Sequence, residues 1–253
     1  FFDELTSETA RAGRKILKEE YDEVIKNVYN NTKKKTSKEC TLRNARQISG
    51  VHYTKDHTGK MEGMPSLSTS TLCNARCRQN AKIKGSICEH CFSESMLNCK
   101  KNMQPCLERN TEILTSRILE DHEIPMIYAT YFRFESFGDL NNSTQCINYF
   151  KHCYKNPHVK FALWTKNPDF IAEAIAMGYA KPDNLVIVLS SLFINVVRDH
   201  SMHPFVDKVF TVYSKDYLLD HPEIIINCGS KNCFMCHICY EKNDVVHIFE
   251  IKK

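Results

Sequence analysis

Eight of the thirteen cysteines in this chain fall into two short groups near its middle and its end. The first group is Cys73, Cys77, Cys88 and Cys91, and the second is Cys228, Cys233, Cys236 and Cys239. Thiolates gathered at short spacing are ligands for soft metals, above all zinc and the iron of iron–sulfur clusters. Proteins held together by disulfides are usually short secreted chains with an even number of cysteines. This chain is long, with 253 residues, and its number of cysteines is odd. We therefore predict that both groups bind metal.

The second group, "CGSKNCFMCHIC", favours a cluster over zinc. Its two CxxC units share Cys236, whereas structural zinc sites usually take two separate CxxC knuckles. A 4Fe–4S cluster takes one thiolate per iron and suits closely spaced loop cysteines. We expect the second group to be a complete ligand set for one such cluster.

The first group leaves both metals open, because its Cys88–Cys91 pair is also an acceptable zinc knuckle. A single cluster with ligands from both groups is a further alternative. His90 and His237 lie inside the groups and are alternative ligands, although histidines so placed more often face solvent or support a ligand. The remaining cysteines stand singly and are predicted to carry no metal: Cys40, Cys99, Cys106, Cys146 and Cys153.

The hydrophobic pattern indicates alternating strands and helices. Strands are predicted over 65–70, 126–136, 160–165, 184–191, 208–214, 223–228 and 245–251, and helices over 3–29, 88–120, 144–156 and 168–180. Such alternation predicts βαβ units and a parallel sheet. We predict an α/β fold, an incomplete TIM-like parallel barrel of about six strands. An open doubly wound sheet is the alternative.

Residues 1–46 are predicted to form an N-terminal helix and a basic arm, and residues 47–253 the partial barrel with both cysteine groups. Much of the net charge of +4 is local to the segment 33–46. This arm is either a solvated linker or a phosphate-binding element, which makes nucleic acid a candidate partner. The remaining substrate, a small molecule or a macromolecule, is not identified by the sequence.

No run of about 18 apolar residues occurs, so no membrane span is expected. The chain begins at Phe1 without the order of a signal peptide, and we expect it to be part of a longer protein. Unpaired thiols favour a reducing, cytoplasmic setting.

Unusual residues recur where the predicted strands end, the reactive side of parallel α/β folds. The first cysteine group follows the first strand, and the second group follows the strand 223–228, so both are expected on one rim. Arg133 and Lys166 are placed there to neutralise a cluster or bind a carboxylate or phosphate. Ser190 ends the fourth strand, and with no histidine or acid placed to activate it we assign it to cofactor binding rather than nucleophilic attack.

A cysteine loop directly after the first strand of a partial barrel resembles the radical-SAM superfamily. In that superfamily three cysteines hold a 4Fe–4S cluster and leave one iron open for S-adenosylmethionine. Cys73 and Cys77 match the first step of the motif, while Cys88, Cys91 and Phe92 resemble its CxxC-aromatic end. The ten-residue insertion between them departs from the motif, and a fourth cysteine would close the open iron.

The resemblance also assigns roles within "FRFESFGDL". Glu135, Ser136 and Asp139 would hold the amino group of the methionine moiety. Lys166 joins them as a catalytic candidate, and Arg133 is a candidate for cofactor binding. The alternative is a strand-end turn, in which Gly138 supplies backbone freedom and Asp139 caps the next helix.

The chain is also similar to a group of phage and gut-bacterial proteins, the gene-product-eighty-eight-like family. The similar segments are "CEHCFS", "FRFESFGDL", "FALWTKNPD" and "NCGSKNCFMCHICY", spread over roughly residues 66–251. This resemblance implies iron–sulfur binding, a cut-down barrel and a phage gene expressed in a bacterial host, and no particular reaction.

Together these patterns predict an iron–sulfur protein with two 4Fe–4S clusters on one face of a radical-SAM-like barrel. Its expected chemistry is redox or radical-type, as an oxidoreductase or as a redox protein or sensor without S-adenosylmethionine. The alternative is a zinc-stabilised nucleic-acid-binding module without catalysis.

Overall fold

The computed structural model describes residues 39–100, 102–229 and 231–252. The chain forms two units, Phe1–Glu39 and Cys40–Lys253. The predicted helix 3–29 and residues 33–38 of the basic arm lie outside the described residues. Cys40 and Ala45 are buried in the core of the larger unit, which therefore includes the end of the segment assigned to the arm. Among the described helices, none is long and apolar enough to cross a membrane.

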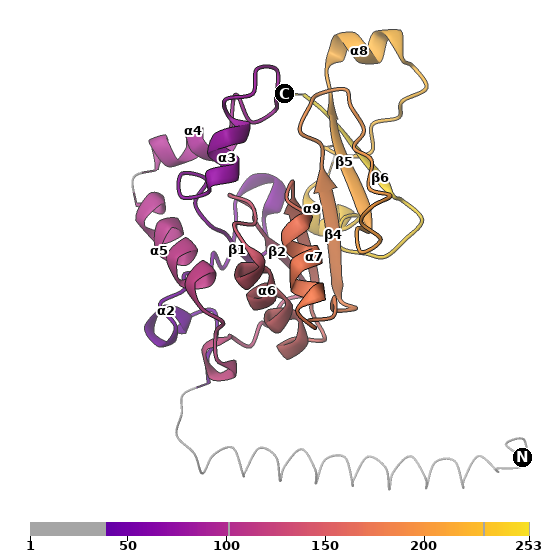
Figure 1. The fold of residues 1–253 in the computed structure, drawn as a ribbon. Coiled ribbons are helices and arrows are strands. Elements are labelled where there is room, and N and C mark those ends of the chain that lie inside the picture. The colour runs from indigo at the N-terminus through magenta and orange to yellow at the C-terminus, as the bar shows by residue number, and fades with distance from the viewer. Residues whose placement is uncertain (1–38, 101, 230, 253) are drawn as a thin grey trace, which may run out of the picture. The chain divides into compact units, whose positions relative to one another are not determined.

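A six-stranded sheet, parallel throughout, forms the centre of the larger unit (Figure 1). Its strands are β1 (Ser66–Leu67), β2 (Tyr131–Phe134), β3 (Lys160–Thr165), β4 (Leu185–Ser190), β5 (Lys208–Tyr213) and β6 (His247–Ile251). The order in the sheet follows the order in the chain, from β1 to β6. This order is that of an α/β barrel, since a doubly wound sheet reverses direction at its switch point. The predicted α/β fold is confirmed, with the sheet left open between β1 and β6.

Short and long helices connect the strands. They are α2 (Ala45–Ile48), α3 (Ala75–Asn80), α4 (Phe92–Cys99), α5 (Met103–Ser116), α6 (Ser143–Lys155), α7 (Asp169–Ala176), α8 (Lys215–Asp220) and α9 (Cys233–Cys236), with 3₁₀ turns at Gly59–Met61 and Asp121–Glu123. The predicted helices at 88–120, 144–156 and 168–180 correspond to α4 with α5, α6 and α7. Asn142 begins α6, because its side chain accepts a hydrogen bond from the backbone N–H of Gln145 at 2.9 Å.

The helices α5, α6 and α7 pack side by side against one face of the sheet (Figure 1). Alternate strand residues point to this face, and Phe132, Phe134, Phe161 and Leu163 are completely buried there. The helices contribute apolar residues at helical spacing, such as Leu107 and Leu114 on α5. Each such side chain contributes about 1.5–3 kcal/mol by leaving water. This layer holds the strands in the register that places their ends together.

The predicted strand at 223–228 is wrong. Only the end of this segment contacts the sheet: Cys228 bridges in parallel to Glu250 of β6, and Asn227 hydrogen-bonds to Phe249, while Ile225 is exposed. The cause is competition for one sheet edge: residues 247–251 pair with β5 along their whole length, which leaves 223–228 outside β6. The second cysteine group therefore precedes the last strand of the sheet and is not the loop that leaves it.

Residues 233–245, which we call the inner segment, instead cross the second face of the sheet. Cys239 and Tyr240 are buried there, against a cluster that includes Met64, Ala162, Val186, Val188 and Ile248. Further along, Glu241 accepts hydrogen bonds from Tyr131 and Lys160, the first residues of β2 and β3. Together with the residues before it, the inner segment leads from Cys228, opposite Glu250 near the end of β6, to the edge where the strands begin. It fills the face that a closed barrel would enclose.

Tyr240 gives a test of this arrangement. Replacing Tyr240 by Ala is expected to lower the free energy of unfolding by about 3–5 kcal/mol, because it empties a buried site beside the rings of Tyr131 and Trp164. Tyr240→Phe is expected to change it by less than about 1 kcal/mol, since the hydroxyl has no hydrogen-bond partner among the described residues. Urea unfolding followed by circular dichroism measures both. Equal losses in the two variants would contradict the packing role, and exposed Ile225→Ala serves as control.

Candidate metal centres and adjoining cavities

The four cysteines of the second group, here the second thiol set, lie on a short helix and the turns around it. Asn232 begins α9 by accepting a hydrogen bond from the Met235 N–H at 2.8 Å. Cys233 and Cys236 are three residues apart on this turn, so they share one face. The chain then turns at His237, in the left-handed conformation with φ 40°, and delivers Cys239 to the buried side.

Burial and two cations shape the second thiol set. Burial raises the pKa of Cys228, Cys233 and Cys239, and their mutual proximity raises it further. Lys60 opposes this, since its Nζ donates to Cys228 Sγ at 3.3 Å and also to Glu250 Oε1 at 2.7 Å. Without metal these thiols are therefore protonated at neutral pH, and metal binding must release their protons.

Arg133, predicted to bind a cofactor, faces the second thiol set. Its guanidinium lies 3.9 Å above the ring of Trp164, and its charge lowers the pKa of Cys233 and Cys239. Its buried Nε has no hydrogen-bond partner among the described residues. Arg133 Nη1 donates to Met61 Sδ at 3.7 Å, so the structure places Arg133 as a partly satisfied cation beside Cys233 and Cys239.

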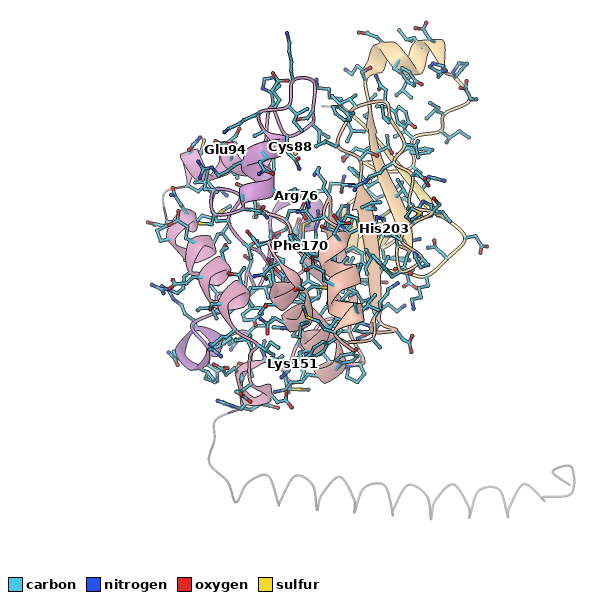
Figure 2. All side chains as sticks on the ribbon, in the orientation of Figure 1. Arg76, Cys88, Glu94, Lys151, Phe170 and His203 are labelled. Atoms are coloured by element: carbon cyan, nitrogen blue, oxygen red, sulfur yellow. The ribbon has the colours of Figure 1, made fainter. Side chains whose placement is uncertain are left out.

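Three of the four cysteines in the first group line a common cavity, and the fourth does not. Cys77 on α3, Cys88, and Cys91 at the start of α4 line a cavity of about 600 Å³ together with Asp139 and Lys166. We call these three the first thiol set. Burial raises the pKa of Cys77 and Cys88, and each of the two responds to the charges of Cys91, Asp139 and Lys166. Figure 2 shows Cys88 beside α3 and α4.

Cys73 stands outside this arrangement. It is exposed and does not line the cavity of the first thiol set. Asn74, which follows it, begins α3 by accepting hydrogen bonds from the N–H groups of Arg76 and Cys77. This cap turns Cys77 toward the sheet and leaves Cys73 before the helix. None of the thirteen cysteines, all within the described residues, forms a disulfide.

The predicted catalytic Glu135 is buried in a hydrogen-bond network. Its carboxylate accepts from Thr69 Oγ1 at 2.9 Å, from the Thr69 N–H at 3.2 Å, from Gln145 Nε2 at 2.6 Å and from the Tyr149 hydroxyl. Burial outweighs these bonds and raises its pKa to about 8. Both oxygens are already occupied, so Glu135 joins β1, β2 and α6 rather than presenting a free carboxylate.

Asp139 is a second buried carboxylate in the same turn. Its Oδ1 accepts from Thr165 Oγ1 at 2.5 Å and from the Leu140 N–H at 2.8 Å, and its Oδ2 accepts from the Lys166 N–H at 2.9 Å. Burial raises its pKa, while the Lys166 charge opposes the rise. Asp139 therefore ties the end of β2 to the end of β3, next to Cys77.

Gly138 makes this turn possible. It has φ 90°, and a Cβ there would lie 2.5 Å from Glu135 Oε2 and 2.6 Å from the Thr69 carbonyl oxygen. Ser136, which precedes it, bonds through its hydroxyl to Ser66 at 3.1 Å and Ser68 at 2.8 Å. The turn is thus packed closely against β1.

Lys166 and Ser190 line a rim cavity of about 280 Å³ that also contacts the second thiol set. Gly138, Asp139 and Lys166 line both this cavity and that of the first thiol set. A larger cavity of about 710 Å³ opens between the two sides of the incomplete barrel. His90 and Phe92 of the first cysteine loop line it, and so do Lys60 and Glu250 beside the second thiol set.

Sequence reasoning missed four residues of these sites: Lys60, Thr69, Gln145 and Tyr149. Thr69 carried a signal, because a polar residue near the end of the predicted strand 65–70 and before a cysteine loop belongs to the reactive edge. Lys60 carried none, since only the folded chain brings it to Cys228.

No family model, curated protein or solved structure matches the chain. The resemblances drawn from the sequence therefore stay predictions.

Gly138 gives a stability test with a matched control. Gly138→Ala is expected to cost about 3–5 kcal/mol, the sum of an unfavourable φ and a clash with backbone. Gly178→Ala has a similar φ of 94° but no atom within 4 Å of the new Cβ, so it is expected to cost about 1–2 kcal/mol. Urea unfolding compares them, and equal losses would show that the close approach at Gly138 carries no energy.

Glu135 gives a pH test. A pKa raised from 4.5 to about 8 means that the folded chain keeps a proton that the unfolded chain releases. Stability is therefore expected to fall as pH rises from 4.5 to about 8 and then to level off. In Glu135→Gln, which does not titrate, the fall over this window is expected to shrink, while in exposed Glu62→Gln it is expected to persist. The measurement is the urea midpoint of each protein at several pH values between 4.5 and 8. If stability falls with pH as steeply in Glu135→Gln as in the wild type, the raised pKa is refuted.

Proposed function

We propose that this chain is an iron–sulfur protein that holds two 4Fe–4S clusters of different character. The observation that carries the proposal is the division of the thiols: four on and around the inner segment, and three lining a cavity. Four thiolates complete the ligands of a cubane cluster, whereas three leave one iron for a ligand from the cavity.

The donor chemistry fits clusters better than zinc. The two CxxC units of the second group share Cys236, whereas structural zinc sites usually take two separate knuckles. A zinc ion needs its thiolates around one centre, while a cubane is held at its corners and accepts ligands that stand further apart. Lys60, Arg133 and Lys166 lie beside the thiols and would offset the negative charge of thiolate-bound clusters.

Each thiol set supports a different role. The second set is partly buried, and its four thiolates would occupy all four irons of a cluster. A cluster without an open iron suits electron transfer. The first set faces a cavity, and S-adenosylmethionine is the ligand that the radical-SAM resemblance implies there. Bound, such a cluster supplies an electron for redox or radical-type chemistry. Asp139 and Lys166 line the cavities of both sets, so they would lie between the two centres.

The substrate would enter the cavity of about 710 Å³ between the open edges of the barrel. The stacked rings of Phe92 and Phe137, with centroids 6.0 Å apart, form part of its wall. Free thiols persist in a reducing compartment, which supports a cytoplasmic setting. A zinc-stabilised nucleic-acid module is the alternative, and Arg43 and Arg46 are the exposed cations of its arm within the described residues.

Cysteine variants test the division of the thiols. Anaerobically purified protein is expected to hold about eight irons and eight sulfides per chain. Replacing Cys77, Cys88 or Cys91 by Ser is expected to halve the iron, and so is replacing Cys233 or Cys239. Metal analysis with absorption and EPR spectra measures the loss.

Cys73→Ser is the matched control for the first thiol set, because Cys73 is exposed and outside the cavity. It is expected to keep all the iron. Zinc without iron in the wild-type protein would refute the proposal and favour the nucleic-acid module. If the reduced protein binds iron but forms no 5′-deoxyadenosine from S-adenosylmethionine, radical chemistry is excluded and the role of a redox carrier or sensor remains.

A further inference from the structure

A separate basic cavity of about 340 Å³ lies at the ends of β3 and β4, and no cysteine lines it. Three cations line it: Arg76 from α3, Lys166 after β3 and Arg198 from the loop after β4. Figure 2 shows Arg76 between α3 and the first turn of α7, where its Nη2 lies 3.6 Å from Asp169. The cations come from three separate parts of the chain, so the fold itself assembles them.

The charge in this cavity is not balanced by the protein. The Asp169 contact is long and both partners are exposed, so it neutralises Arg76 weakly. Asp139 is a second acidic neighbour, and its charge also acts on Arg198. Three cations against two carboxylates leave an excess of about one positive charge, which suits an anion.

One nitrogen of Arg198 donates to the Lys166 carbonyl oxygen at 2.8 Å, and the Arg198 backbone N–H donates to Ser191 Oγ at 3.1 Å. These bonds fix the side chain before any ligand arrives. Its remaining N–H groups form a fork that matches the oxygens of a phosphate.

The opposite wall of the cavity is apolar. It consists of Leu192, Phe193 and Val196, and Phe193 is 41% exposed. An exposed ring beside a cluster of cations provides a surface on which a flat ring can stack. Asn167 also lines the cavity, and its buried Oδ1 has no hydrogen-bond partner among the described residues. A ligand N–H or O–H would satisfy this oxygen.

We propose that this cavity binds a phosphate monoester joined to a planar ring, the chemistry of a nucleoside monophosphate. A phosphate monoester presents three acceptor oxygens to the three cationic side chains, whereas a carboxylate presents two. The volume lies in the range of small-molecule sites. The proposal rests on the cavity alone and holds whether or not the thiol sets bind iron.

The site is coupled to the first thiol set. Phe193 bridges to Ser86, and the Ile87 N–H donates to the Leu192 carbonyl oxygen at 2.8 Å, directly before Cys88. Lys166 lines both cavities. A bound nucleotide would therefore lie against the loop that carries the thiols, as a substrate or as an effector of it.

Calorimetric titration of the full chain with AMP, adenosine, inorganic phosphate and benzoate tests the proposal. AMP is expected to bind about tenfold or more tightly than any of the others, because only AMP has both a dianion and a planar ring. Adenosine binding as tightly as AMP would overturn the phosphate assignment. Benzoate binding as tightly as AMP would overturn the choice of phosphate over carboxylate. A complete lack of AMP binding would refute the proposed nucleotide site.

Three variants locate the site. Arg76→Gln and Arg198→Gln are each expected to weaken AMP binding about tenfold, and Phe193→Ala about fivefold. Arg109→Gln, an exposed arginine on α5 outside the cavity, is the matched control and is expected to bind as the wild type does. Circular dichroism checks folding. If Arg198→Gln does not fold, Arg76→Gln and Phe193→Ala decide, since both side chains are exposed, and wild-type affinity in both would refute the site.

Discussion

The close approach of Gly138 to Glu135 and Thr69 is the constraint on which both candidate metal sites depend. A buried carboxylate is costly unless donors surround it, and the donors to Glu135 come from Thr69, just after β1, and from Gln145 and Tyr149 of α6. The missing side chain of Gly138 lets the chain reverse within van der Waals distance of these groups. As a result Arg133, just before the turn, faces the second thiol set, and Asp139, just after it, faces the first.

An incomplete barrel must also cover its inner face. In a closed barrel, layers of branched side chains fill the interior. Here the inner segment crosses the open sheet, and Tyr240 packs against strand residues such as Val186 and Val188. The same segment carries three of the four cysteines of the second thiol set. The inner segment therefore supplies both metal ligands and part of the buried core. For this reason metal binding and folding stability are linked at this site.

Local pattern predicted most of the fold. The runs at 160–165, 184–191 and 208–214 coincide with β3, β4 and β5 to within a residue at each end, because each is apolar and ends at a polar turn. The failure at 223–228 has a different origin. Both 223–228 and 247–251 are suitable strands by composition, and the choice between them depends on which one pairs with β5. That choice is made by tertiary packing, which a local pattern does not contain.

The sequence could predict the type of site, a cluster of thiols at the strand ends, but not which residues belong to each site. Spacing alone grouped Cys73 with Cys77, yet the cap formed by Asn74 places them on different sides of the start of α3. The sequence also suggested Glu135 as a reactive acid, whereas only the fold reveals that its oxygens are already bonded. Residues at strand ends could be recognised because parallel strands end at one edge. Which of them face a cavity depends on side-chain directions that only the packed structure sets.

Lys166 shows how the parts combine. Its backbone N–H binds Asp139, its carbonyl oxygen accepts from Arg198, and its side chain lines three cavities. The backbone bonds fix where its side chain begins, while the ammonium group can respond to whatever charge occupies the neighbouring sites. A thiolate in the first thiol set and a dianion in the basic cavity would both attract it. Because one lysine cannot neutralise both fully, the charge state of the thiols and the affinity for an anion must depend on each other.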